Sequence, residues 1–175
     1  LEISYRGEIY HPPKESAFLR FVAPSQTTGL IGEEGVYLSA ETHWYPDLPS
    51  TLATFRLVAK TPPDWEAVSQ GDLVSRKSDP QGVQTIWKVK APTDALALVA
   101  GPFVVNTKKL GGVTLSTYFF KEDAHLSDEY LEASARYLET YSRLLGNYPF
   151  SKFVVVENFF ASGLGFPSFT LLGSQ

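Results

Sequence analysis

The chain has 175 residues, of which 43% are hydrophobic, 14% aromatic and only 19% charged, a composition that favours a folded, strand-rich globular protein over a disordered chain. The formal net charge of −4, with no concentrated basic segment, argues against nucleic-acid binding. The absence of cysteine excludes disulfides and thiolate-bound metal. The sequence contains no run of about 18 apolar residues, so no transmembrane helix is predicted in it.

The first two thirds of the chain carry the signals of short β-strands. Leu1, Ile3 and Tyr5 alternate with polar neighbours, as in a strand that is already under way where the sequence starts. Further runs rich in aromatic, aliphatic and β-branched residues lie at 17–23, 36–39, 53–60, 84–90, 95–100 and 103–108. Turn signals with proline or glycine separate most of these runs. The pattern predicts an antiparallel β-sandwich or a large curved, saddle-like sheet.

A helix is predicted near the carboxy-terminal end. Ser127 is a suitable N-cap, Asp128 and Glu129 complement the helix dipole, and Gly146 is suited to end the helix. Between these ends, residues recur at helical spacing along one side, which is the expected packing face: Tyr130, Leu131, Ser134, Tyr137, Leu138, Tyr141, Leu144 and Leu145.

The order of the elements predicts two units. Strands are expected over 113–120 before the helix, and over 153–158 and 167–172 after it. Residues 1–111 are therefore predicted to form a β-rich amino-terminal domain, incomplete at its start. Residues 112–175 are predicted to form a small α+β part in the order strand–helix–strand–strand. The fold class is mainly β.

No complete catalytic or metal-binding set is visible in the sequence. His11, His43 and His125 are far apart, so the H-E-x-x-H arrangement that binds zinc is absent. Nucleophile-elbow, phosphate-loop and dinucleotide motifs are absent as well. The aromatic pair Trp44-Tyr45 allows two interpretations, a packed loop or a stacking platform for a ligand.

Several segments resemble the M1 family of zinc peptidases (gluzincins). In the β-rich part they are Gly35-Val36-Tyr37-Leu38, Trp44-Tyr45-Pro46, residues 63–71 and residues 95–103. In the second part they are Tyr118-Phe119-Phe120, the tyrosine-rich helix and residues 145–153. The resemblance implies a saddle-shaped amino-terminal β-domain followed by the beginning of a thermolysin-like catalytic domain, truncated before the zinc motif.

The resemblance also implies a substrate-binding strand. The family carries its G-x-M-E-N motif on an edge strand that lines the substrate cleft. Ser162 to Phe166 correspond to the five motif positions, and Pro167 matches a residue that often follows them. The substrate-binding residues that this implies are Gly163, Leu164, Gly165, Phe166 and Pro167. In the family, the motif's glutamate binds the free α-amino group of the substrate. Gly165 occupies that position and has no carboxylate, which argues against a true aminopeptidase.

The family's zinc ligands and catalytic residues correspond to positions beyond Gln175. The resemblance therefore implies zinc in a full-length parent, no cofactor in this chain, and no hydrolysis by this chain alone. Its expected role is the outer wall of the peptide cleft, with the remainder of the catalytic domain and the peptide substrate as partners. The apolar residues from Phe153 to Leu172 are expected to face that remainder. Without it, they would drive self-association as a homodimer.

Two other interpretations stay open at this point. An M1-like scaffold without peptidase activity that binds proteins is motivated by the glycine at position 165. A free-standing β-sandwich that binds a ligand, for example a carbohydrate, would use the surface of Trp44 and Tyr45. Residues that follow position 175 in a parent would separate the peptidase from the scaffold without activity, because H-E-x-x-H and a later glutamate are needed for peptidase chemistry.

Overall fold

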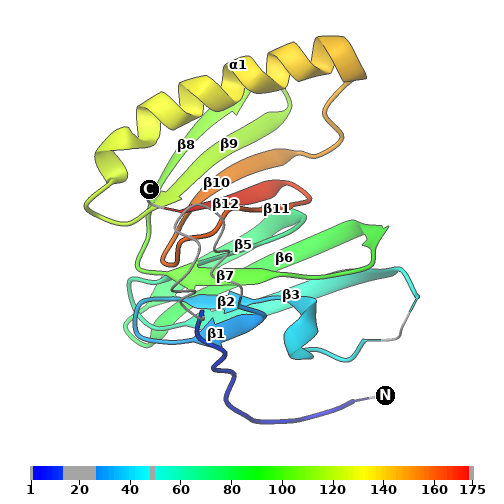
Figure 1. Cartoon of the computed structure of the whole chain (residues 1–175), viewed down its shortest axis with the longest axis vertical. Helices are drawn as coiled ribbons and strands as arrows, with labels where there is room; N and C mark the ends of the chain where they lie inside the picture. The colour runs from blue at the N-terminus through cyan, green and yellow to red at the C-terminus, as the bar shows by residue number, and fades with distance from the viewer. Residues whose placement is uncertain (1, 14–26, 48–49, 174–175) are drawn as a thin grey trace, which may run out of the picture.

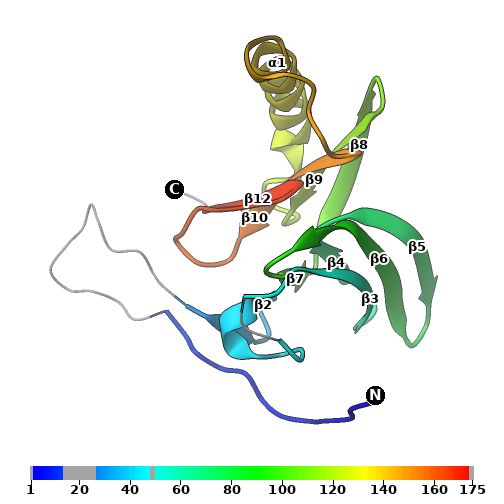
Figure 2. The same cartoon turned by 90° about the vertical axis from the view of Figure 1, so that its right-hand side faces the viewer.

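The structure, a computed structural model, describes residues 2–13, 27–47 and 50–173. This part of the chain contains three β-sheets and one long α-helix. The five-stranded sheet lies between the helix and the two smaller sheets in both views (Figures 1 and 2). The prediction of a mainly β fold with a small α part is confirmed. The strand predicted at 17–23 lies outside the described residues.

The two smaller sheets are antiparallel. One has the order β1-β2-β7-β4 and contains β1 (Gly29–Ile31), β2 (Val36–Leu38), β4 (Glu66–Ser69) and β7 (Leu98–Gly101). The other has the order β3-β6-β5 and contains β3 (Ala53–Thr61), β5 (Asp72–Asp79) and β6 (Gly82–Thr93). A short 3-10 helix, η1 (Ala40–Thr42), follows β2. The predicted strands at 36–39, 53–60 and 84–90 are confirmed, and the strand predicted at 95–100 begins only at Leu98. Strands β1, β4 and β5 were not predicted.

The strand predicted from Leu1 to Tyr5 is wrong for the residues that the structure describes. Residues 2–9 are assigned to no strand, and Tyr10 forms only an isolated bridge with Leu30. Ile3 and Tyr5 are 52% and 62% exposed. The alternating pattern here is not accompanied by burial of one face, and burial is what stabilises a strand at the sheet surface.

The five-stranded sheet is mixed and has the order β11-β12-β10-β9-β8. Its strands are β8 (Val104–Leu110), β9 (Val113–Phe119), β10 (Lys152–Asn158), β11 (Leu164–Phe166) and β12 (Phe169–Gly173). β10 is parallel to both β9 and β12, and the other two pairings are antiparallel. The sheet is therefore not wholly antiparallel, because the helix between β9 and β10 supplies the crossover that a parallel pair requires.

Gly111 and Gly112 form the turn of the β8–β9 hairpin. Gly111 has a φ of 55°, a left-handed conformation that suits glycine at a tight turn. Strand β8 consequently shares a sheet with the elements that follow it. The division into domains at 1–111 and 112–175 stays a prediction.

Helix α1 (Ser127–Leu145) begins and ends close to the predicted residues. A 3-10 turn, η2 (Ala124–Leu126), leads directly into it, so Ser127 already has helical dihedral angles and does not act as the N-cap. Its hydroxyl instead accepts a hydrogen bond of 3.0 Å from the Asn106 side chain on β8. Gly146 ends the helix at a φ of 97°, as predicted. Within the described residues, no helix combines the length and apolar character of a membrane span.

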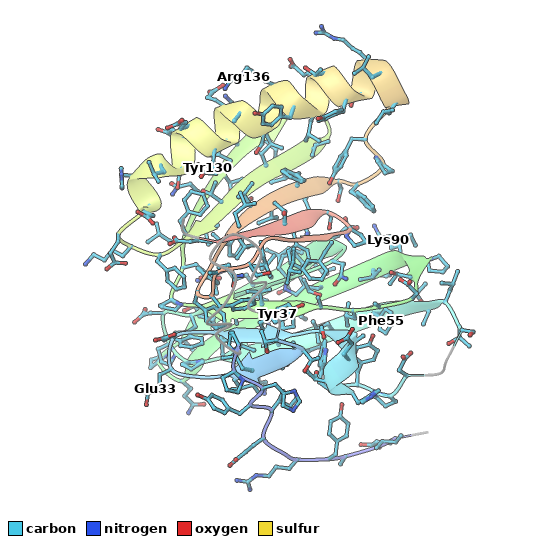
Figure 3. The ribbon with its side chains drawn as sticks, viewed as in Figure 1. Glu33, Tyr37, Phe55, Lys90, Tyr130 and Arg136 are labelled. Carbon is cyan, nitrogen blue, oxygen red and sulfur yellow. The ribbon has the colours of Figure 1, made fainter. Side chains whose placement is uncertain are left out.

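Only the first half of the predicted helix face is buried. Leu131 and Ala135 pack with Leu115 of β9 in a small core, and Figure 3 shows Tyr130 on the sheet side of α1 and Arg136 on the outer side. The second half carries an exposed apolar stripe: Tyr137, Tyr141, Leu144 and Leu145, with exposures of 64%, 56%, 71% and 83%. The end of the helix projects past the β8–β9 turn in Figure 1, so no strand lies beneath it there.

Most apolar residues from Val154 to Leu171 belong to the main core, contrary to the predicted exposed patch, although Leu172 is 39% exposed. This core joins the five-stranded sheet to the smaller sheets and includes Val154, Val156, Phe169 and Leu171, each at most 2% exposed. Trp87 of β6, 1% exposed, packs among them. The segment finds cover within its own chain because the amino-terminal sheets lie against it. The α1 stripe is an apolar surface that stays uncovered.

Candidate functional site

The predicted substrate-binding residues lie on and around β11. Among the residues that the structure describes, this strand is at the edge of the five-stranded sheet and pairs only with β12. Leu164 and Phe166 are half-buried and pack against the main core, whereas Gly163, Gly165 and Pro167 are exposed. The structure therefore brings the five predicted residues together on one edge strand. Their role in binding substrate stays a prediction.

The turn between β11 and β12 has two residues, Pro167 and Ser168, between the paired Phe166 and Phe169. Proline fixes φ at the first turn position, and Ser168 has a φ of 70° at the second, as in a type II turn. The rings of Phe166 and Phe169 stack at 4.7 Å, which holds the two strands together beside the turn.

The outer edge of β11 is available at Gly165. In a two-residue hairpin the closing pair, here Phe166 and Phe169, exchanges backbone hydrogen bonds. The next pair, Gly165 and Thr170, is then a non-hydrogen-bonded pair, so the N–H and C=O of Gly165 point away from β12. A Cβ added at Gly165 would meet nothing within 4 Å. This edge can therefore accept an extended peptide as a further strand.

Two polar side chains at the ends of β10 fasten the β11–β12 hairpin. Asn158 donates a hydrogen bond of 2.8 Å to the carbonyl of Ser162, just before β11. Lys152 donates a hydrogen bond of 2.9 Å to the hydroxyl of Ser168, in the turn after β11. Sequence reasoning missed both residues. The signal that could have found Lys152 is a lysine at the head of the apolar run Phe153 to Val156.

A cleft of about 810 Å³ lies between the β5–β6 hairpin and strands β8 to β10. Its acidic groups are paired within the chain. Glu66 accepts two hydrogen bonds from Nε of Arg76, at 2.9 and 3.0 Å. Asp72 lies 2.6 Å from Nζ of Lys90, and hydrogen bonds from Lys90 and Ser151 lower the pKa of its carboxyl. The carboxylates of Glu66 and Asp72 thus already have hydrogen-bond partners within the chain.

Lys152 lies at the inner end of this cleft and is 7% exposed. Burial lowers the pKa of its amino group to about 7, because removal from water penalises the charged form, while the charge of Asp72 acts in the opposite direction. The same cause raises the pKa of Tyr118, another buried residue of the cleft.

The side chains of His11 and His125 have local partners. Nδ1 of His11 lies 2.7 Å from the Thr28 hydroxyl, and Nδ1 of His125 lies 2.9 Å from the carbonyl of Glu122. Among the described residues, no group of three or more histidine and acidic side chains could hold a metal ion.

The ring of Tyr45 packs edge-on against both Trp44 and Phe55, at 5.0 and 5.5 Å. Its hydroxyl accepts a hydrogen bond of 3.0 Å from the amide of Leu96. These contacts favour a packed loop over a stacking platform.

Comparisons with known proteins place this fold. No protein-family model and no curated protein sequence matches the chain. Among solved structures, an M1 zinc metallopeptidase from Deinococcus radiodurans superposes with a TM-score of 0.66 at 22% identity, over 92% of this chain and 40% of that one. A variant of an M1 zinc metallopeptidase from this organism, bound to a Tyr-Ser-Ala substrate, gives a TM-score of 0.62 at 20% identity, over 91% and 40%. Legionella pneumophila aminopeptidase A, in complex with aspartic acid, gives 0.67 at 20% identity, over 82% and 19%.

The chain thus has a fold found in M1 zinc metallopeptidases. More particularly, it resembles their amino-terminal part, and it spans no more than about 40% of the length of these structures. The expected resemblance is confirmed at the level of the fold.

Proposed function

We propose that this chain is the non-catalytic amino-terminal part of an M1-type zinc metallopeptidase and forms the outer wall of its peptide cleft, with β11 facing the substrate. The observation that carries the proposal is the position of Gly163 to Pro167. The segment that resembles the family's substrate-binding motif is also an exposed edge strand with outward backbone groups at Gly165. An extended peptide would bind by adding a strand to this edge. The parent's zinc and the rest of its catalytic domain would carry out hydrolysis.

The outward amide of Gly165 provides the test. In the full-length parent, Gly165→Pro removes this N–H and leaves the bonds between β11 and β12 in place. One lost hydrogen bond is worth about 0.5–1.5 kcal/mol, so KM for a peptide is expected to rise roughly 2- to 13-fold. Gly112→Ala is the control, because a Cβ there meets nothing within 4 Å and the residue lies in the β8–β9 turn, outside the substrate-binding segment. An unchanged KM in Gly165→Pro would show that peptide does not bind along β11.

A second candidate function is supported by the same residue. An M1-like scaffold without peptidase activity has no need of a carboxylate at position 165, where this chain has glycine. The two candidates differ in the parent's metal site. Stoichiometric zinc and peptide turnover support the peptidase, and a parent that lacks both supports the protein-binding scaffold.

The α1 stripe is expected to make the isolated chain self-associate. Contiguous exposed apolar side chains at this spacing mark a surface that another protein covers. The double variant Tyr141→Lys and Leu145→Lys is expected to be monomeric at concentrations where the unmodified 175-residue chain forms dimers, as measured by sedimentation velocity. Leu52→Lys, a change at another exposed apolar residue (67%), is the control. An unmodified 175-residue chain that is monomeric at every concentration would contradict this expectation.

A further inference from the structure

Lys152 is buried in surroundings that do not favour a lysine. It is the first residue of β10 and is 7% exposed. Its Nζ lies over the ring of Trp87, 5.1 Å from the centroid, and 5.6 Å from the centroid of Phe169. A buried amino group destabilises the fold unless its hydrogens have partners. Its partners therefore show what the residue does.

The hydrogen-bond partner of Lys152 is Ser168 in the turn between β11 and β12. Nζ donates to the Ser168 hydroxyl at 2.9 Å and to the Ser168 carbonyl at 3.4 Å. Ser168 is 3% exposed and has a φ of 70°, a left-handed conformation that is unfavourable for a residue with a side chain. Such a conformation persists where neighbouring groups hold it. The Lys152 amino group thus contacts two atoms of Ser168, whose carbonyl also accepts a hydrogen bond of 3.1 Å from the amide of Val154.

The same amino group reaches the amino-terminal sheets. Trp87 belongs to β6, on the far side of the cleft from β10. Asp72, the carboxylate whose charge acts on Lys152, is hydrogen-bonded to Lys90 and Ser151. Lys152 therefore joins three parts that are distant in sequence: strand β10, the turn after β11, and strand β6.

We propose that Lys152 is a positioning residue, which fastens the β11–β12 turn against Trp87 of β6 and thereby fixes where the edge strand β11 lies. The consequence for peptide binding rests on the proposed function of β11. The positioning itself is a property of this chain and can be measured without any peptide.

Amide hydrogen exchange in the 175-residue chain provides the measurement. Lys152→Met keeps most of the apolar stem and removes the donors. Exchange of the amides in residues 164–171 is expected to become at least about tenfold faster, while exchange in β3 and β6 changes much less. Lys109→Met is the matched control. This lysine lines the same cleft but donates to Thr114 of β9, so exchange in residues 164–171 should stay unchanged.

A second variant keeps the test decisive if Lys152→Met fails to fold. Ser168→Gly removes the hydroxyl acceptor and suits a φ of 70°. It is expected to accelerate exchange of the same amides by a smaller factor. Unchanged exchange in residues 164–171, or equal acceleration throughout the chain, would overturn the proposal. A local acceleration would support it even if Gly165→Pro leaves KM in the parent unchanged, so the two proposals fail separately.

Discussion

Peptides with a free amino terminus are expected to be cleaved by the parent hardly faster than the same peptides with an acetylated amino terminus. The reason is Gly165, which lacks the carboxylate that the M1 zinc peptidases, the family that this chain resembles, use to bind the α-amino group. A partly desolvated contact between an ammonium and a carboxylate is worth roughly 2–4 kcal/mol, or about 30- to 1000-fold in rate. Without it, the ratio of kcat/KM for free and acetylated peptides should lie near one.

Gly165→Glu tests the same point in the opposite direction. Nothing lies within 4 Å of the position that a Cβ would occupy, so the backbone at position 165 can accept a side chain's first carbon without a clash. The variant is expected to raise the preference for free amines by at least about tenfold. Gly165→Gln, which has the same size and no charge, is expected not to do so. A strong preference in the unmodified parent would mean that another acidic residue binds the amine.

The strands with a clear alternating or apolar pattern could be predicted from the sequence. The expected strands at 113–120 and 153–158 agree with β9 and β10 to within one residue. Helix α1 could be predicted because Ser127 and Gly146 bracket a long amphipathic segment. In these segments the local signal and the tertiary environment agree, because each packs one or both faces against the core.

Strand β5 could not be predicted in this way. Residues Asp72 to Asp79 are mostly polar, and most of them are exposed. Their strand conformation comes from pairing with the long neighbouring strand β6, which the sequence of β5 does not reveal. The buried half of α1 has a similar explanation. The periodicity gives one continuous apolar side from Tyr130 to Leu145, but only the position of the sheet decides which part of it is covered.

Part of the candidate site could be predicted from the sequence, and part of it could not. Family resemblance indicated Gly163 to Pro167, and the topology shows that the central three of these residues form the edge strand β11. The residues that hold this strand could not be predicted, because Trp87 meets Lys152 and Ser168 only after the three-stranded sheet has packed against the five-stranded sheet. A buried lysine has no local sequence signal beyond its apolar neighbours.

The stability of the chain is expected to depend on pH through Lys152. Its pKa is 10.5 in the unfolded reference and about 7 in the fold, because burial disfavours the charged form. Between these two values the unfolded state binds more protons than the folded state. The contribution of this residue to the free energy of unfolding therefore rises with pH from about 7 to about 10.5, and it is constant outside this window.

Comparison of the wild-type chain with Lys152→Met isolates this contribution, because the other titrating groups are common to both proteins. The free energy of unfolding, measured with urea at pH 7, 8 and 9, is expected to increase in wild type relative to the variant. The relative increase should be on the order of 1 kcal/mol for each pH unit, the value for one proton that only the unfolded state binds. Lys109→Met controls for the loss of a positive charge in the same cleft. Parallel pH profiles for wild type and Lys152→Met would mean that the lysine titrates alike in both states, and that its amino group is not held in the buried position between Trp87 and Ser168.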